Sequence, residues 1–339
     1  MVWAAALPFH LFPVADDMST AMNSEEIYVR TALQRLALDE GAKRYVMGNP
    51  NLYRVLLAAS RPFIGGEVRD EALACARQLN RAGHKVTIDY VGESSREHSV
   101  VDEAAAEFLS LADDLLKTDL YANISLDLSH IGLLIDPTLA VHHLCNIAGR
   151  LEDSGREVIV SAESFVRVDA VLNATKASLG KQRNIGVTVQ AYLPRTGRDV
   201  QSLLSDSPAL VRIVKGSFDP PLGAYERGEA LNGAYLSLVK IVADSGTPVL
   251  LATHDPRIIQ EVQAEIAGDR LDPKLIRFEF LLGIAEDRLQ TARMQGRSTQ
   301  VYITYGKEWF LYLCNRLAEH PPNLIPALGR ALKAITDHQ

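Results

Sequence analysis

Four polar side chains near the C-terminus share one face of a predicted helix. Residues 306–320 are predicted to be helical, and Tyr312, Asn315, Arg316 and Glu319 are spaced i, i+3, i+4 and i+7 within them. An arginine on such a face can grip a carboxylate, and Glu319 can lie near an amine. We therefore expect a helix that faces a substrate. The alternative is a solvated face on which Arg316 and Glu319 pair with each other.

Eight short segments rich in β-branched residues alternate with helical stretches after residue 84. Their starts are 23 to 38 residues apart, which is the length of one βα unit. This pattern predicts an α/β fold, a (β/α)8 barrel of the TIM type, with an open doubly wound sheet as the alternative. The Gly-x-Gly-x-x-Gly turn of dinucleotide-binding folds and the Walker A loop are absent from the sequence. The eight segments are 85–91, 123–128, 157–160, 186–190, 211–214, 248–251, 277–280 and 300–303.

In such a barrel the active site lies at the C-terminal ends of the strands. Many polar residues of this chain fall at those positions, so we expect them to cluster at one mouth. Each also has a structural alternative: His254 can be a satisfied core histidine and Lys215 a cation on the rim. The residues are Asp89, Glu93, Asp127, Glu163, Gln190, Tyr192, Lys215, Gly216, Thr253, His254, Asp255, Glu279, Tyr302 and Tyr305.

Helices are predicted before the barrel. Ser24 is a suitable N-cap for a helix that runs to about Glu40, where Gly41 can break it. Further helices are expected over 51–60 and 68–83. We expect residues 1–65 to form an N-terminal helical arm and residues 66–339 the barrel, together one structural unit.

Composition excludes several classes of protein. The 339 residues are 47% hydrophobic and 23% charged, with a net charge of −7, so the chain can bury a large core and lacks the basic footprint of a nucleic-acid-binding protein. No apolar run approaches the length of a membrane span, and the apolar start has no basic region typical of a signal peptide. Three cysteines without metal-like spacing fit a reducing compartment, with Cys75 and Cys145 as small core residues on helices. We expect a cytoplasmic protein with no metal site.

An ordered set of motifs resembles the proline dehydrogenase family, in its monofunctional bacterial form. Each motif alone is weak, but they occur in family order and cover roughly residues 55–325. They are Phe63-Ile-Gly-Gly-Glu67, Asp89-Tyr-Val-Gly-Glu93, Gln190-Ala-Tyr-Leu193, Arg212-Ile-Val-Lys-Gly216, Thr253-His-Asp255 and Arg316-Leu-Ala-Glu319.

The resemblance implies an FAD across the C-terminal mouth, closed over by the helix that follows the eighth strand. In this family, proline is oxidised to pyrroline-5-carboxylate by hydride transfer to flavin N5, and a quinone or another acceptor such as oxygen reoxidises the flavin. The implied cofactor-binding residues are Gln190, Arg212, Lys215, Gly216, Ser217, Thr253 and His254. The implied catalytic residues are Asp127, Tyr302 and Glu319, and the implied substrate-binding residues are Tyr312, Asn315, Arg316, Glu279 and Leu282.

The chain departs from the family pattern in the substrate half of the site. Asn315 replaces one of two adjacent arginines, and Asp127 replaces a lysine, which together make the pocket three charge units more negative. Ser161 stands where the family has an aspartate, and Glu279 and Leu282 stand where it prefers Gln and Tyr.

These changes point to another substrate. We expect Asp127 to face Glu319, so that the two carboxylates share a proton or bind a cationic substrate. L-proline is then not the preferred substrate, and a more basic amine, or a hydrazine- or imine-type nitrogen compound, suits the pocket better. Specialised biosynthesis is a setting in which such a change would make sense.

Three alternatives remain open. The chain can be a genuine L-proline dehydrogenase, or a catalytically inactive barrel that acts as a binding partner. A metal-dependent hydrolase around His254 is disfavoured, because no histidine cluster lies at a strand end and His142-His143 fall in a predicted helix. Peripheral contact with the inner face of a membrane and homo-oligomer formation are further open expectations.

Overall fold

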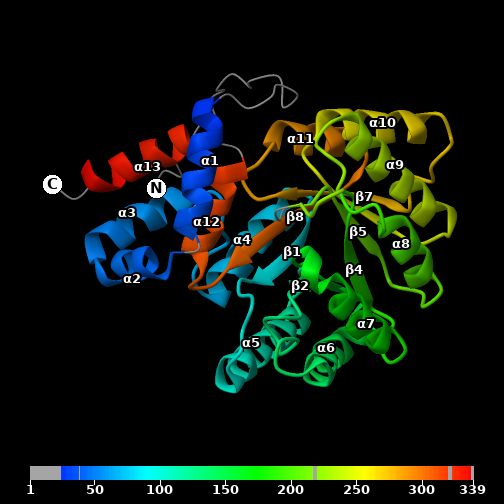
Figure 1. Ribbon diagram of the computed structural model, residues 1–339, viewed down its shortest axis with the longest axis horizontal. Coiled ribbons are helices and arrows are strands. Elements are labelled where there is room, and N and C mark those ends of the chain that lie inside the picture. The colour runs from blue at the N-terminus through cyan, green and yellow to red at the C-terminus, as the bar shows by residue number, and fades with distance from the viewer. Residues whose placement is uncertain (1–23, 38, 217–219, 320–322, 337–339) are drawn as a thin grey trace, which may run out of the picture.

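Eight parallel strands close into a barrel in chain order, as Figure 1 shows. The computed structural model describes residues 24–37, 39–216, 220–319 and 323–336. β1 and β8 close the ring with Lys85 beside Gln300 and Tyr90 beside Tyr305. The prediction of a (β/α)8 barrel is therefore confirmed. The strands are β1 (Lys85–Tyr90), β2 (Ala122–Leu126), β3 (Val158–Val160), β4 (Ile185–Gln190), β5 (Val211–Val214), β6 (Val249–Ala252), β7 (Ile276–Leu281) and β8 (Ser298–Tyr305).

Helices α4 to α11 lie around the barrel, as the two views together show. Their apolar faces pack against the outward residues of the strands; in α5, for example, Val101, Ala104 and Phe108 are buried at helical spacing. The helices outside this ring are α1 (Ser24–Ala37), α2 (Glu40–Gly48), α3 (Pro50–Ser60), α12 (Trp309–Glu319) and α13 (Leu324–Thr336). The ring consists of α4 (Arg69–Arg81), α5 (His98–Leu116), α6 (Pro137–Leu151), α7 (Val168–Leu179), α8 (Thr196–Leu204), α9 (Glu229–Asp244), α10 (Pro256–Ala267) and α11 (Glu286–Met294).

Strand residues alternate between the helices and the barrel axis. Val86 and Ile88 in β1 are fully buried in the main apolar core. Thr87, between them, instead points across the barrel, since its hydroxyl donates a hydrogen bond to Glu279 on β7. The inward positions are largely polar, so this barrel has a hydrogen-bonded interior.

Helix α12 rests on helices α1 and α3 from the N-terminal part of the chain, and α13 packs against α3. Its residues Trp309, Phe310 and Leu313 belong to a second apolar cluster, which also contains Ala37 of α1 and Ala59 of α3. In Figure 1 the blue helices α1 to α3 and the red helices α12 and α13 lie together beside the barrel. This packing fixes one face of α12 and leaves its polar face to the barrel mouth.

The first helix differs from the sequence-based expectation. It ends at Ala37 and not near Glu40, and Gly41 lies inside α2. The reason is a cap that the sequence analysis overlooked: Asp39 accepts hydrogen bonds from the Gly41 and Ala42 amides and so starts a new helix. Cys75 and Cys145 do lie on helices, where they are half-buried. Across the described ranges, no helix combines the length and apolarity needed to cross a membrane.

Candidate active site at the C-terminal mouth of the barrel

Arg212 of β5 occupies the centre of the polar interior. Its Nε donates to Thr188 Oγ1 at 2.8 Å, and its Nη2 donates to Ser125 Oγ at 2.7 Å and to Ser161 Oγ at 3.3 Å. Nη1 lies 3.4 Å from Glu279 Oε2. Four strands thus hold one guanidinium in place, and only 4% of its side chain is exposed.

Glu279 lies deeper than expected for a residue that contacts substrate. Its side chain is 3% exposed, and besides Arg212 it accepts hydrogen bonds from Thr87 and from Gln300 Nε2. A buried carboxylate needs such partners, because an uncompensated charge in the interior is costly. Glu279 is therefore part of the barrel interior beneath the mouth.

Carboxylates gather at the ends of β1, β2 and β3. Burial raises the pKa of Asp89 to about 6, although a hydrogen bond from Tyr302 and the charge of Arg212 oppose the rise. The pKa of Asp127 is raised well above its ordinary value by burial and by the charges of Asp89, Glu163 and Glu93. This part of the mouth is an acidic cluster, which we define as Asp89, Glu93, Asp127 and Glu163.

Glu319 is not among the carboxylates that act on Asp127. Its Oε1 instead accepts a hydrogen bond from Arg316 Nη2 at 2.5 Å, and it also attracts Arg227. The expectation that Asp127 faces Glu319 therefore differs from the arrangement found. The i, i+3 spacing on α12 explains this, since it brings Arg316 and Glu319 together on the helix itself.

The polar face of α12 closes the other side of the mouth. The Arg316 guanidinium lies 4.9 Å from the centre of the Tyr312 ring, and its side chain is only 13% exposed. Burial raises the pKa of the Tyr312 hydroxyl to about 12. Tyr302 lies between the two sides, because its hydroxyl donates a hydrogen bond to Asp89 and its phenol lies near Arg316. Asn315 and Leu282 are half-buried at the same mouth.

The structure thus brings together five of the residues predicted for substrate and chemistry: Asp127, Tyr302, Tyr312, Arg316 and Glu319. The Arg316 guanidinium, paired with Glu319 on α12, lies across Tyr302 from the acidic cluster. Such a polarised mouth can bind a small molecule that carries a carboxylate and an ammonium group.

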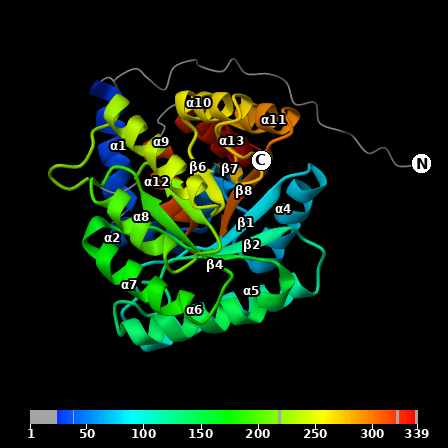
Figure 2. The same ribbon diagram turned by 90° about the vertical axis from the view of Figure 1, so that its right-hand side faces the viewer.

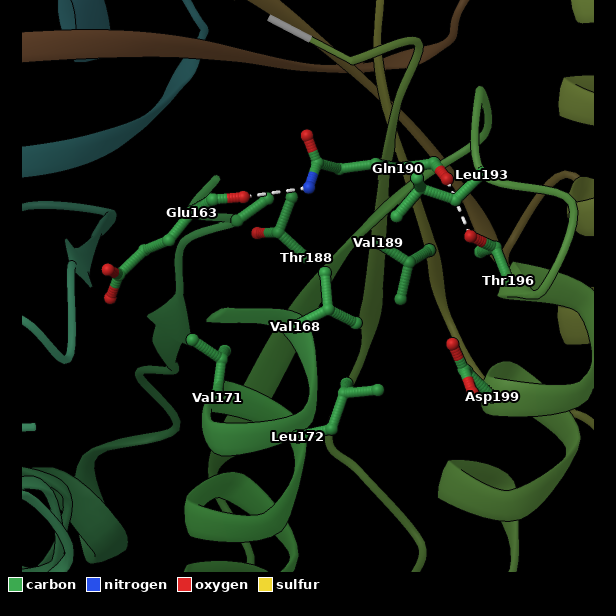
Figure 3. Close-up of a pocket in the computed structure, with 11 residues that line it drawn as sticks. Glu163, Val168, Val171, Leu172, Thr188, Val189, Gln190, Leu193, Thr196 and Asp199 are labelled. Carbon is green, nitrogen blue, oxygen red and sulfur yellow. Dashed lines mark hydrogen bonds between the residues drawn. The ribbon is translucent and has the colours of Figure 1, made fainter. Parts of the chain in front are cut away.

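Most residues predicted for the cofactor lie at the ends of β4, β5 and β6. Arg212, predicted with them, lies instead in the barrel interior, where other side chains hold its guanidinium. Gln190 Nε2 donates to the Glu163 carbonyl at 2.8 Å, as Figure 3 shows, whereas its buried Oε1 has no hydrogen-bond partner among the described residues. Lys215 pairs with Asp255, which also caps α10 by accepting from Arg257 N. His254 Nε2 accepts from Leu281 N at 3.0 Å. The cavity behind Gln190 measures about 30 Å³, which is enough for about one water molecule but not for a substrate.

Gly216 is required by its surroundings within the chain. Its φ is +128°, and a Cβ at this position would lie 1.5 Å from Tyr192 Cδ1. The glycine therefore admits the Tyr192 ring, which is a requirement within the chain itself and separate from the cofactor contact that the resemblance implies. Thr253 Oγ1 is buried and accepts from Asp255 N at 3.2 Å. The predicted cofactor residue Ser217 lies outside the described residues.

These residues fit a flavin. Gln190 Oε1 offers a buried acceptor for a ring N–H, and Lys215 places an ammonium group at the mouth where negative charge on a flavin can be stabilised. His254 is fixed by its bond to β7 and closes the same side.

The sequence analysis placed Asp89 at a strand end but assigned it no role in substrate binding or catalysis. It stands at the end of β1 and bonds Tyr302, so the rule that active sites lie at strand ends pointed to it, as did the motif Asp89-Tyr-Val-Gly-Glu93. The interior partners Thr87, Thr188 and Gln300 could have been found from their inward position in alternating strands.

Comparison with known proteins agrees with this architecture. Residues 72–220 match the family model for proline dehydrogenase. Proline dehydrogenase 1 of Bacillus subtilis is 29% identical over 277 residues, which covers 81% of this chain and 91% of the relative. Proline dehydrogenase of Deinococcus radiodurans is 27% identical over 267 residues, covering 77% of this chain and 86% of the relative.

Among solved structures, proline utilization A from Bdellovibrio bacteriovorus has the same fold, with a TM-score of 0.70 and 17% identity. The match covers 87% of this chain and 41% of that longer one. The chain is therefore similar to the proline dehydrogenases over most of its length, and this similarity supports an oxidoreductase that acts on an amino-acid-like substrate.

Proposed function

We propose that the chain is an FAD-dependent dehydrogenase of a small amino-acid-like substrate that is more basic than L-proline. The observation that carries the proposal is Asp127, at the end of β2 beside Asp89, where the resemblance predicts a lysine. An aspartate at this position attracts a cation that a lysine would repel. The proposed substrate is an amine or a hydrazine-type compound that keeps one carboxylate.

Arg316 binds the substrate carboxylate, and the Tyr312 ring holds the guanidinium in place. With Asn315 in place of a second arginine, one arm of the carboxylate clamp is an uncharged amide. The substrate ammonium lies toward Asp127 and Asp89. At an effective dielectric near 20, a charge pair about 4 Å apart contributes roughly 4 kcal/mol, so the acidic cluster can outweigh the lost arginine.

Tyr302 orients the substrate between the two ends, since its hydroxyl is held by Asp89 and its ring lies 5.3 Å from the Arg212 guanidinium. Bound FAD supplies hydride acceptance at flavin N5, which turns the amine-bearing carbon or nitrogen into an imine-type product. Gln190, Lys215 and His254 are the residues that we assign to hold it. A quinone or oxygen then takes the electrons.

A second candidate is L-proline dehydrogenase itself. It is favoured by the relatives, which carry that name and match over about nine-tenths of their length. Arg316, Tyr312, Tyr302 and Glu319 are all present in the arrangement described above. The two candidates differ in one measurable property, the charge that the substrate presents to Asp127.

The test is an anaerobic titration of the purified holoenzyme followed by flavin absorbance. The panel holds L-proline, cyclic amines, hydrazino acids, and N-acetylproline as a control without an ionisable amine. Bleaching by a basic amine or hydrazino acid at much lower concentration than by L-proline supports the proposal. Bleaching by L-proline at the lowest concentration of the panel establishes the second candidate. A protein that cannot be loaded with FAD overturns both and favours a non-catalytic binding role.

A further inference from the structure

The N-terminal mouth of the barrel, at the end opposite the active site, contains a polar cavity of about 540 Å³. Its lining includes Lys85 at the start of β1, Asn123 in β2, Glu157 before β3 and Arg277 in β7. A volume of this size is typical of sites for small molecules.

Two carboxylates line the cavity, Asp119 and Glu157, and the Glu157 carboxylate is already bound by neighbouring side chains. Both Glu157 oxygens lie 2.7 Å from Arg277 Nη1, and Oε2 also accepts from Asn123 Nδ2 at 2.6 Å. Asn123 Oδ1 in turn accepts from the Glu157 amide at 3.0 Å. Glu157 therefore compensates one cation and is held by a reciprocal pair of hydrogen bonds with Asn123.

Lys85 is the second cation of this floor. In the part of the chain that the structure describes, no carboxylate lies within ion-pair distance of its ammonium group. Burial and the charge of Arg277 lower its pKa, and the charge of Glu157 opposes them. Lys85 and Arg277 thus share the Glu157 carboxylate. Arg156 and Asp119 also line the cavity, so three cations and two carboxylates give the lining a net charge of about +1.

Hydrogen bonds hold the rim of the cavity, which is formed by the loop between α5 and β2, in place. Arg156 Nη2 donates to the carbonyls of Leu115, Thr118 and Leu120, at 3.0, 3.0 and 3.1 Å. Asn80 donates to the Tyr121 carbonyl and accepts from the Tyr121 amide. The loop between α5 and β2 is thereby tied to its neighbours, so the cavity does not depend on a change of shape.

We propose that this cavity binds a small oxyanion, a carboxylate or a phosphate, between Lys85 and Arg277. An anion at this point neutralises the second cation and accepts charge-assisted hydrogen bonds from both side chains. The site lies at the end of the barrel away from the acidic cluster. Its ligand therefore stabilises the protein without competing with the amine substrate.

The test is calorimetric titration and thermal unfolding of the holoenzyme with sodium phosphate, sodium malonate and sodium chloride at matched ionic strength. We expect saturable binding of phosphate or malonate, with an upward shift of Tm that chloride does not give. The anion that binds with the lower Kd, phosphate or malonate, identifies the class of oxyanion. Equal shifts with all three salts overturn the proposal.

Three variants locate the site. Lys85→Met should weaken binding by at least about tenfold, the value of one charge-assisted hydrogen bond, whereas Lys85→Arg should retain it. Lys117→Met removes a lysine that is 72% exposed near the same mouth and should change nothing. Glu157→Gln, which removes the competing carboxylate, should tighten binding. Unchanged affinity in Lys85→Met, or weaker affinity in a folded Glu157→Gln protein, contradicts the assignment.

Discussion

The Arg212 guanidinium and the Glu279 carboxylate form an ion pair across the barrel interior, with Nη1 and Oε2 3.4 Å apart and side chains 4% and 3% exposed. The family pattern has an aspartate at position 161 and a glutamine at position 279, whereas this chain has Ser161 and Glu279. Relative to the pattern that the resemblance implies, the carboxylate that pairs with Arg212 lies on β7 and not directly after β3. Ser161 keeps only a hydrogen bond to the same guanidinium, at 3.3 Å.

This ion pair predicts a non-additive double-mutant cycle. Arg212→Met leaves Glu279 buried without its cation and should lower the free energy of unfolding by about 3–5 kcal/mol. Combining it with Glu279→Gln should recover part of that loss, because no uncompensated charge remains. Urea denaturation of the single and double variants measures both values. A double variant less stable than Arg212→Met would show that the two side chains act independently.

Restoring the family charges should restore proline turnover. Asp127→Lys combined with Asn315→Arg adds three positive units to the mouth and should raise kcat/KM for L-proline by about tenfold or more, equivalent to about 1.4 kcal/mol or more of transition-state free energy. Turnover of the basic amine should fall in the same variant. Stopped-flow flavin reduction measures both. If proline turnover does not rise in a folded, flavin-loaded double variant, these positions do not set specificity.

Asp89 should make stability depend on pH. Its pKa is about 6 in the folded chain, above the ordinary 3.8, so its contribution to stability is fully present below about pH 4 and is lost as the pH rises through 6. Asp89→Asn keeps an acceptor for the Tyr302 hydroxyl and should raise the free energy of unfolding by about 1–3 kcal/mol at pH 8 relative to its effect at pH 4. Denaturation at pH 4, 6 and 8 tests this. Asp119→Asn, at an exposed carboxylate, is the control and should show no such trend.

Arg316 should dominate carboxylate binding. Arg316→Met should raise KM for a carboxylate-bearing substrate by about a hundredfold, because the charged pair between arginine and carboxylate is lost. Arg316→Lys should recover only part of the affinity, because lysine lacks the planar guanidinium that binds a carboxylate through two hydrogen bonds. Steady-state kinetics with an amine and its carboxylate-free analogue separates the two effects. Arg330→Met, on the exposed side of α13, is the matched control. An equal loss for both substrates would mean that Arg316 acts only by holding Glu319.

Alanine substitutions at Gly216 and Gly223 distinguish the cost of side-chain crowding from the cost of backbone strain. Both have positive φ, +128° and +84°, but only the Gly216 position is filled, by the Tyr192 ring. Gly216→Ala should lower the free energy of unfolding by about 3 kcal/mol or more, whereas Gly223→Ala should cost about 1 kcal/mol. Thermal unfolding compares them. Similar losses would show that the left-handed backbone alone sets the cost.

The barrel could be predicted because each strand is rich in β-branched residues and the segments between strands have the length of one βα unit. The mouth followed from one rule about strand ends, which selected Asp127, Gln190 and Lys215. The pairing of residues could not be predicted in the same way. Glu279 was expected at the substrate, but its partners Arg212 and Thr87 come from strands 67 and 192 residues away along the chain.

Contacts between residues close in the sequence were easier to predict than contacts between residues far apart in it. The Arg316–Glu319 pair follows from helical spacing alone, whereas the association of Asp127 with Asp89 depends on the closure of the barrel and the depth of each side chain. Asp39 lies between these two cases. Its role as a helix cap is a local signal in the sequence, but the nearby Gly41 suggested the end of a helix and not the start of one.

The packing of α12 on α1 and α3 divides the molecule into two parts that can vary separately in evolution. The barrel strands close on one another through β1 and β8 without help from those helices, whereas the face that carries Tyr312 and Arg316 is positioned by segments before and after the barrel. Selection could therefore change substrate choice by altering the terminal helices that position α12, while the barrel itself stayed unchanged. Divergence within the family can then begin outside the pocket, at residues that never meet the substrate.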